Sequence, residues 1–220
     1  MTGNLKLYSY WRSSAAYRVR IALNLKRLPY EVVPVSLLDN GGMQHSPEFA
    51  QLNPQELVPV LRDGHRTIRQ SMAIIEYIDE TWETPPLMPP TPRERARVRA
   101  LAQLVACDVH PLANLRVLQY LEREMNVPAP EREVWVRHWV RLGLQAFEKM
   151  LAETPSTGTF CEGDTPGLAD CMLVPQVYTA QRFGVELAPY PTIRRITAEC
   201  LALDAFDAAR PEKQPDAPAH

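Results

Sequence analysis

The sequence predicts an α/β domain followed by an all-α domain. Strand-like and helix-like segments alternate over residues 5–82, and a proline-rich stretch, ETPPLMPPTP, then occupies residues 83–92. After residue 93 no strand pattern follows, and long segments carry the apolar spacing of helices. A chain of 220 residues is long enough for two such domains.

The first elements follow the order strand, helix, strand. LKLYSY at residues 5–10 alternates apolar or aromatic residues with polar ones, as strands do, and the segment from Ser14 has the apolar spacing of a helix. YEVVPV at residues 30–35 predicts a second strand. Turn and capping residues dominate residues 36–53, which predicts a loop with at most a short helix.

A hairpin and a helix complete the first half. ELVPVLRDGHRTIRQ predicts two strands that turn at Asp63 and Gly64, and SMAIIEYIDETW predicts a helix capped by Ser71. The proline-rich stretch cannot continue a helix or a central strand, so it is expected to link the two domains.

The second half is expected to contain helices over residues 93–125, 130–153, 168–183 and 191–209. Asp170 lies three residues after Gly167, so its carboxylate should cap the third of these helices from within. The arginines of RERARVR are expected to face solvent, and the polar, proline-rich end of the chain is expected to lie on the surface.

Charge and composition favour a small-molecule protein of the cytoplasm. The formal net charge is −2, which gives no electrostatic basis for binding nucleic acid or an anionic membrane. No apolar run reaches the length of a membrane span, and the N-terminus lacks the apolar centre of a signal peptide. The four cysteines have no metal-ligand spacing, so we expect reduced, mostly buried thiols and no metal site.

Polar residues gather at expected element ends. Ser13 and Ser14 stand where the first strand gives way to the first helix, and Ser71 stands at the start of a later helix, where amides can bind a carboxylate. Pro59, at the entry to a strand, is either an edge-strand residue or a cis-proline. A cis bond there would turn the backbone of Val58 outward to pair with an extended peptide.

These segments together resemble the zeta class of the glutathione transferases. The resemblance covers YSYWRSSAAYRVRIALNLK, LNPQELVPVL, QSMAIIEYIDE, DVHPLANLRVLQYL, GDTPGLADCMLVPQVYTAQRF, ELAPYPTI and QPD. It implies a thioredoxin-like βαβ-ββα domain at residues 4–84 that binds glutathione, an all-helical substrate-binding domain at 92–212, a flexible tail at 213–220, and a homodimer. It also favours the cis form of Pro59. Ala15 replaces the cysteine of the class's usual Ser-Ser-Cys, so no thiol is available there.

The resemblance also implies the site residues. Ser13 matches the position that activates the glutathione thiol, with Ser14 as the alternative, and Arg12 and Arg182 would clamp a dicarboxylate substrate. Glutathione would be bound by Ser13, Ser14, Gln44, Val58, Pro59, Gln70, Ser71, His110, Asn114 and Arg116. Read without the resemblance, His110 and Asn114 would be solvated residues at a kink caused by Pro111.

The implied activity is a glutathione-dependent cis–trans isomerisation of maleylacetoacetate to fumarylacetoacetate, with no metal and no redox cofactor. Three alternatives remain. Maleylpyruvate is a closely related, shorter substrate; a general glutathione transferase would have an apolar pocket without paired arginines; and a non-catalytic glutathione-binding protein would not need both serines and Arg182.

Overall fold

The computed structural model describes residues 5–218 and divides into two compact units. The first unit comprises the chain up to Leu87 and again from Leu201 onward, and the second is Met88–Cys200. The helical domain was predicted to extend to residue 212, but the chain from Leu201 onward belongs to the first unit. The physical reason for this different boundary is burial: the apolar side chains of Phe206 and Ala209 are buried, and both residues belong to the first unit.

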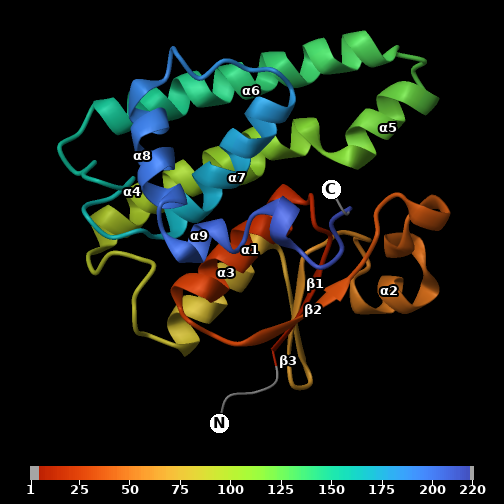
Figure 1. Ribbon diagram of the computed structural model, residues 1–220, viewed down its shortest axis with the longest axis horizontal. Coiled ribbons are helices and arrows are strands. Elements are labelled where there is room, and N and C mark those ends of the chain that lie inside the picture. The colour runs from red at the N-terminus through yellow and green to blue at the C-terminus, as the bar shows by residue number, and fades with distance from the viewer. Residues whose placement is uncertain (1–4, 219–220) are drawn as a thin grey trace. The chain divides into compact units, whose positions relative to one another are not determined.

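The first unit is built on a mixed sheet, which within residues 5–218 has four strands in the order β2-β1-β3-β4 (Figure 1). These strands are β1 (Leu5–Ser9), β2 (Tyr30–Pro34), β3 (Val60–Asp63) and β4 (Arg66–Arg69). β1 pairs parallel with β2 and antiparallel with β3, and β3 pairs antiparallel with β4. Helices α1 (Ser14–Leu25) and α3 (Ser71–Thr81) pack against each other. The predicted βαβ-ββα order and thioredoxin-like fold are confirmed.

The loop after β2 contains short helical pieces, as expected. Two 3-10 turns, η1 (Asp39–Gly41) and η2 (Met43–His45), precede helix α2 (Pro47–Leu52), which Ser46 caps by accepting from the backbone N–H of Phe49 at 3.2 Å. The proline-rich linker is non-helical between α3 and α4, which agrees with its composition.

A buried ion pair fastens the end of α1 to α3. The Nζ atom of Lys26 lies 2.5 Å from Oδ1 of Asp79 and donates to the carbonyl of Trp82 at 2.6 Å. Asp79 also accepts from the backbone N–H of Leu87 at 2.7 Å. These bonds satisfy a charge pair that burial would otherwise penalise, and they fix the first part of the linker to the first unit.

The C-terminal segment folds onto α1 rather than forming a loose tail. Helix α9 (Asp204–Asp207) lies beside α1 (Figure 1), and the turn η5 (Pro211–Lys213) follows it. Gln214 is buried and donates through Nε2 to the carbonyls of Ala208 and Arg210 at 3.1 and 2.8 Å. The flexible tail expected at residues 213–220 is therefore corrected over the described residues 213–218.

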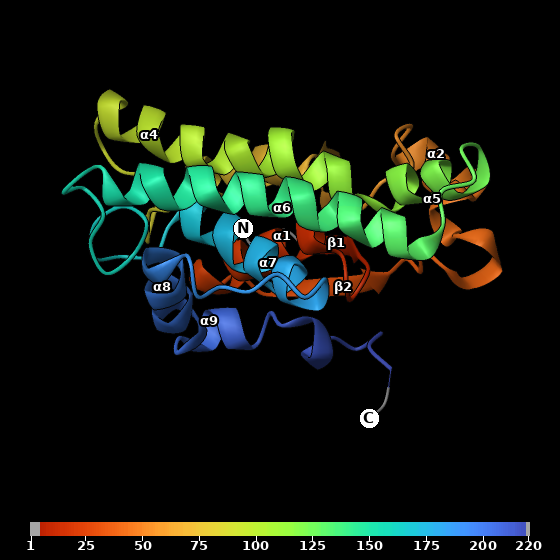
Figure 2. The same ribbon diagram turned by 90° about the horizontal axis from the view of Figure 1, so that it is seen from above.

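The second unit is helical throughout its regular structure. It contains α4 (Pro92–Gln103), α5 (Leu115–Arg123), α6 (Ala129–Ala152), α7 (Leu168–Arg182) and α8 (Pro191–Leu201). Helix α7 contacts both α4 and α6, and the colours in Figure 2 show that α4 and α6 run in opposite chain directions. The predicted helix over 191–209 is in fact interrupted after Leu201, and no helix within residues 5–218 has the length and hydropathy needed to cross a membrane.

The predicted helix over residues 93–125 is broken in the middle. A π-helical turn, η3 (Leu104–Val109), continues α4 and leads into the 3-10 turn η4 (His110–Ala113) that contains Pro111. Gly143 of α6 lies against Val109, and a Cβ atom at position 143 would overlap the Val109 side chain. The absence of a side chain at Gly143 therefore allows α6 to approach the π turn closely.

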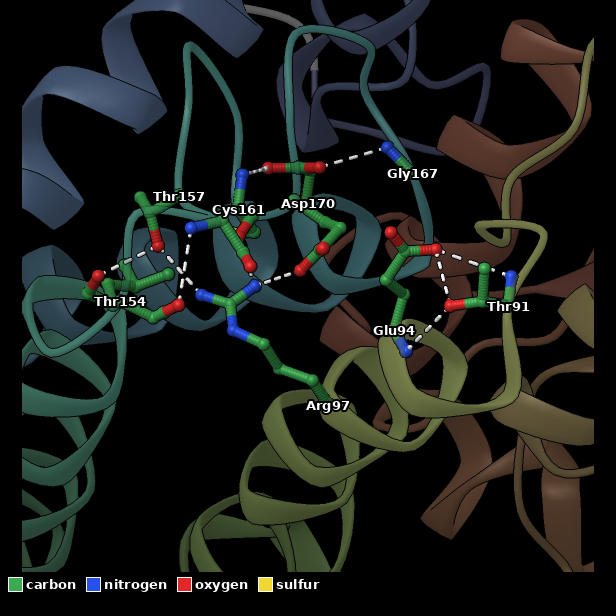
Figure 3. A network of polar contacts seen from close by, with 11 residues as sticks. Thr91, Glu94, Arg97, Thr154, Thr157, Cys161, Gly167 and Asp170 are labelled. Carbon is green, nitrogen blue, oxygen red and sulfur yellow. Dashed lines mark hydrogen bonds and ion pairs between the residues drawn. The ribbon is translucent and has the colours of Figure 1, made fainter.

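Arg97 of α4 is not a solvent-facing arginine, contrary to expectation. Its guanidinium donates to the carbonyl of Cys161 at 2.8 Å and to Oγ1 of Thr157 at 2.7 Å, and it pairs with Glu162 (Figure 3). These bonds attach the loop between α6 and α7 to α4. This role could not be predicted from the sequence, because the partners of Arg97 lie about sixty residues further along the chain.

Asp170 has the structural role that its spacing predicts. Its Oδ2 accepts from the backbone N–H of Gly167 at 2.9 Å, and its Oδ1 accepts from that of Cys161 at 3.0 Å (Figure 3). Burial raises the pKa of Asp170, and the two backbone donors oppose that shift. The carboxylate thus caps α7 and ties the preceding loop to it.

Candidate functional site

The turn between β1 and α1 holds the pair of serines. A hydrogen bond from the N–H of Ser13 to the carbonyl of Tyr10, at 2.9 Å, closes the turn. Ser13 is the N-cap of α1, and its Oγ accepts from the backbone N–H of Ala16 at 3.2 Å. Ser14 is the first residue of the helix, and the guanidinium carbon of Arg12 lies 5.2 Å from the ring centre of Trp11.

This geometry leaves the Ser13 hydroxyl able to donate. A serine hydroxyl has one proton and two acceptor positions, and the cap to Ala16 uses an acceptor position only. The proton can therefore be directed at an anion in front of the helix, where the partial positive charge of the helix N-terminus also acts.

The bond between Val58 and Pro59 is cis, as the resemblance implies. The pairing of β3 with β1 begins at Val60, opposite Tyr8, so these two residues stand at the entry to the strand. Val58 belongs to a buried cluster with Tyr10, and Trp11 packs against the same cluster. The strand entry and the serine turn are thus joined by one small apolar core.

The start of α3 is strained. Gln70 has φ 70° and ψ 122°, a conformation that residues with a Cβ atom rarely adopt. Gln70 and not Ser71 occupies the N-cap, so the predicted cap by Ser71 is wrong, and Ser71 is the first helical residue. The strain is typical of ligand-binding positions, and the amides of the first turn are available to an anion.

A buried arginine supports the hydroxyl of Ser71. Arg18 of α1, which is 2% exposed, donates through Nη1 to Oγ of Ser71 at 3.2 Å. With the acceptor side of the hydroxyl engaged, its proton can be donated outward to a carboxylate. Arg18 was not among the site residues predicted from the sequence, although an arginine inside an apolar helical run indicates a buried polar role.

Gln44 lies in the loop before α2 and is 5% exposed. Its Nε2 lies 3.0 Å from Nε2 of His45, and its buried Oε1 makes no hydrogen bond within residues 5–218. Gly42 has φ 104°, and a Cβ atom there would overlap the Gln44 amide. The loop is thus shaped around this amide.

The remaining predicted residues belong to the second unit. Asn114 is the N-cap of α5: its Oδ1 accepts from the N–H of Arg116 at 3.2 Å, and its Nδ2 lies 3.4 Å from Nε2 of His110. The π turn that presents His110 could not be foreseen, because it depends on packing against α6. Arg182 ends α7, with its guanidinium carbon 4.6 Å from the ring centre of Phe183.

Among the residues that the structure describes, no group of three or more His, Cys, Asp or Glu side chains is arranged to hold a metal ion. Burial raises the pKa of the Cys161 and Cys200 thiols, and Cys171 is buried as well. Only Cys107, within residues 5–218, is an exposed thiol. The expectation that the cysteines are mostly buried is confirmed.

The family model for the glutathione S-transferase N-terminal domain matches residues 7–86. A probable maleylacetoacetate isomerase of Vibrio cholerae is 52% identical over 97% of this chain and 99% of that protein. A maleylpyruvate isomerase of Ralstonia sp. is 48% identical over 96% of this chain and 99% of that protein.

Solved structures agree with these relatives. The holo structure of maleyl pyruvate isomerase, a bacterial glutathione S-transferase in zeta class, has a TM-score of 0.94 and 47% identity and covers 97% of this chain and 100% of its own. A maleylacetoacetate isomerase from Anaeromyxobacter dehalogenans, with dicarboxyethyl glutathione and citrate bound in the active site, has a TM-score of 0.86 and 45% identity, with 99% of each chain covered.

Proposed function

Because the chain belongs to the zeta class of the glutathione transferases, we propose that it is a glutathione-dependent cis–trans isomerase of maleylacetoacetate. The observation that carries this proposal is the geometry of Ser13. Its hydroxyl caps α1 as an acceptor and keeps its proton for an anion at the helix N-terminus. A glutathione thiolate is such an anion.

Activation of the thiol is the first task. A thiol with an unperturbed pKa of about 8.5 is only slightly ionised at neutral pH, and the thiolate is the nucleophile. Donation from Ser13, with the N-terminal end of the α1 dipole, favours the thiolate. Ser14 contributes to the same helix end.

The reaction then needs no net proton transfer. The thiolate sulfur adds to one carbon of the cis double bond, and the π electrons move onto the conjugated carbonyl as an enolate. Rotation about the resulting single bond follows. Collapse of the enolate re-forms the double bond in the trans geometry and expels the thiolate. The dicarboxyethyl glutathione bound by the Anaeromyxobacter relative is a thioether of the kind that such an addition produces.

Two arginines are proposed to hold the substrate. Arg12 follows Trp11 in the turn between β1 and α1 and is half-buried, whereas Arg182, at the end of α7, is exposed. Each guanidinium group is able to pair with a carboxylate. They would orient the dianion and stabilise the enolate.

Glutathione binding is assigned to both units. In the first, Val58 and Pro59 would pair with the peptide backbone, Gln70 and Ser71 would bind its γ-glutamyl carboxylate, and Gln44 would contact its other end. The strained φ of Gln70 and the donation from Arg18 to Ser71 support this assignment.

In the second unit His110, Asn114 and Arg116 would border the same ligand, either in their own subunit or across a homodimer. We place this homodimer in the cytoplasm, where thiols and glutathione remain reduced.

Maleylpyruvate is the second candidate substrate, favoured by the 48% identity to the Ralstonia enzyme. The test is to measure glutathione-dependent isomerisation of both substrates with the purified chain. We expect the higher kcat/KM with maleylacetoacetate. A higher value with maleylpyruvate would reverse the order, and activity with neither would refute the isomerase assignment.

A further inference from the structure

Charged side chains hold both backbone polar groups of Trp11, which belong to the two peptide units on either side of its Cα atom. The backbone N–H of Trp11 donates to Oδ2 of Asp216 at 2.8 Å, and the carbonyl of Trp11 accepts from Nη2 of Arg20 at 3.0 Å. Trp11 lies inside the turn that Tyr10 and Ser13 close, where neither group belongs to a helix or a strand. The partners come from α1 and from a segment more than two hundred residues away.

Arg20 is fully buried, and several hydrogen bonds hold its guanidinium in place. Besides Trp11 it donates to Oγ of Ser9 at 3.0 Å and to the carbonyl of Ala209 at 3.0 Å. Burial lowers its pKa to about 10, and the negative charge of Asp216 opposes that shift, so the guanidinium stays charged at neutral pH. One buried cation thus binds the end of β1, the turn and the C-terminal segment together.

Asp216 belongs to a C-terminal segment that hydrogen bonds hold in place. Gln214, two residues earlier, is buried and bonded to two carbonyls, and Asn24 of α1 donates to the carbonyl of Ala205 at 2.9 Å. A carboxylate held by a rigid element can position its partner more precisely than one on a loose tail.

The two carboxylate oxygens of Asp216 have different surroundings. Oδ1 is buried and makes no hydrogen bond within residues 5–218. A buried acceptor without a partner costs free energy, and such groups call for a functional explanation. A role of this carboxylate in holding the Trp11 backbone through Oδ2 would be such an explanation.

We infer that Asp216 is a positioning residue that, together with Arg20, fixes the backbone on both sides of the Trp11 Cα atom and through it the hydroxyl of Ser13. Trp11 is two residues before Ser13, so a rotation of either peptide plane that flanks Trp11 would move the helix cap as well. The catalytic part of this inference rests on the proposed isomerase function, whereas its structural part does not.

The structural part is tested by amide hydrogen exchange in the full chain. Asp216→Ala should speed exchange about tenfold at the amides of Trp11 and Ala16, the second because it donates to Ser13. Asp216→Asn keeps an acceptor and should give a smaller change. Asp207→Asn is the matched control, since Asp207 pairs with Arg210 and Lys213 in the same segment. Faster exchange at Trp11 but not at Ala16, or equal effects in the control, would overturn the inference.

The catalytic part is tested by kinetics and by ultraviolet titration of the bound thiolate. Asp216→Ala should lower kcat about ten to a hundredfold, because a misplacement of about 1 Å can cost about a hundredfold in rate, and it should raise the thiol pKa. KM for glutathione should change by less than about twofold, since the other contacts remain, and Asp216→Asn should recover part of kcat. An unchanged kcat would refute the positioning role. If the wild-type chain shows no isomerase activity, the proposed function fails, and amide exchange alone still decides whether Asp216 positions Ser13.

Discussion

The Oγ atom of Ser13 accepts a hydrogen bond from the backbone N–H of Ala16 at 3.2 Å. One side chain therefore has two tasks that different substitutions can separate. As an acceptor it stabilises α1, and as a donor it is proposed to stabilise a thiolate. Because only the second task needs the hydroxyl proton, the chemistry can be removed while the helix cap is kept.

Ser13→Ala should lose both tasks, and Ser13→Asp only the donor. We expect the alanine variant to lose about 1 kcal/mol of unfolding free energy and the aspartate variant to keep the cap. Both should raise the pKa of the bound glutathione thiol and lower kcat. Thermal unfolding and ultraviolet titration of the thiolate measure the two effects. A normal titration curve in Ser13→Asp, with a shifted one in Ser14→Ala, would transfer the role to Ser14.

Gln70 should show a conflict between stability and binding. Its φ of 70° suits glycine, so Gln70→Gly should be more stable than Gln70→Ala by about 1 kcal/mol. Both variants should bind glutathione about fivefold or more weakly, because each lacks the amide. Chemical denaturation and isothermal titration calorimetry test this pair. A glycine variant less stable than the alanine variant would show that the backbone is not strained.

Arg182→Ala should separate substrates by charge. Charge-assisted hydrogen bonds contribute about 1.5 to 3 kcal/mol, so kcat/KM for maleylacetoacetate should fall about ten to a hundredfold. Conjugation of glutathione to an uncharged electrophile should change much less, and Arg182→Lys should restore only part of the loss because lysine lacks the planar fork. Equal losses for both kinds of substrate would assign Arg182 a structural role.

Gly143→Ala should destabilise the second unit. The new methyl group would overlap Val109, whose β-branched side chain has little freedom to move. Overpacking of this kind costs about 1 to 3 kcal/mol, measured by denaturant unfolding. The double variant Gly143→Ala, Val109→Ala should be less destabilised than the sum of its two single variants. Strict additivity would mean that the two positions do not clash.

The buried thiols should make stability depend on pH in alkaline solution. The pKa values of Cys161 and Cys200 are raised by burial, so in the native state both thiols remain protonated above the pH at which they ionise in the unfolded chain. Their contribution is complete below about pH 8.5, and stability then falls by up to about 1.4 kcal/mol per pH unit for each thiol. Cys200→Ala should flatten this slope when unfolding is followed between about pH 9 and 10. An unchanged slope would contradict the assignment.

The features that were predicted correctly from the sequence depend mostly on interactions between residues close together in the chain. The period-two pattern of β1, the apolar spacing of α1 and α3 and the prolines of the linker act within a few residues, so they can be read without knowing the fold. The capping of α7 by Asp170 is equally local, because the carboxylate reaches back only three residues. The family resemblance supplied the cis form of Pro59.

Only the tertiary structure could decide the roles of residues whose partners are distant in the chain. Arg97 reaches a loop beyond α6, the π turn depends on the close approach of Gly143, and Asp216 meets Trp11 from the far end of the chain. In the sequence alone, Arg97, Gly143 and Asp216 are ordinary polar or small residues. Burial decides the role of the polar residues, because a polar group removed from water is stabilised by a hydrogen-bond partner, and the fold determines which partner is near.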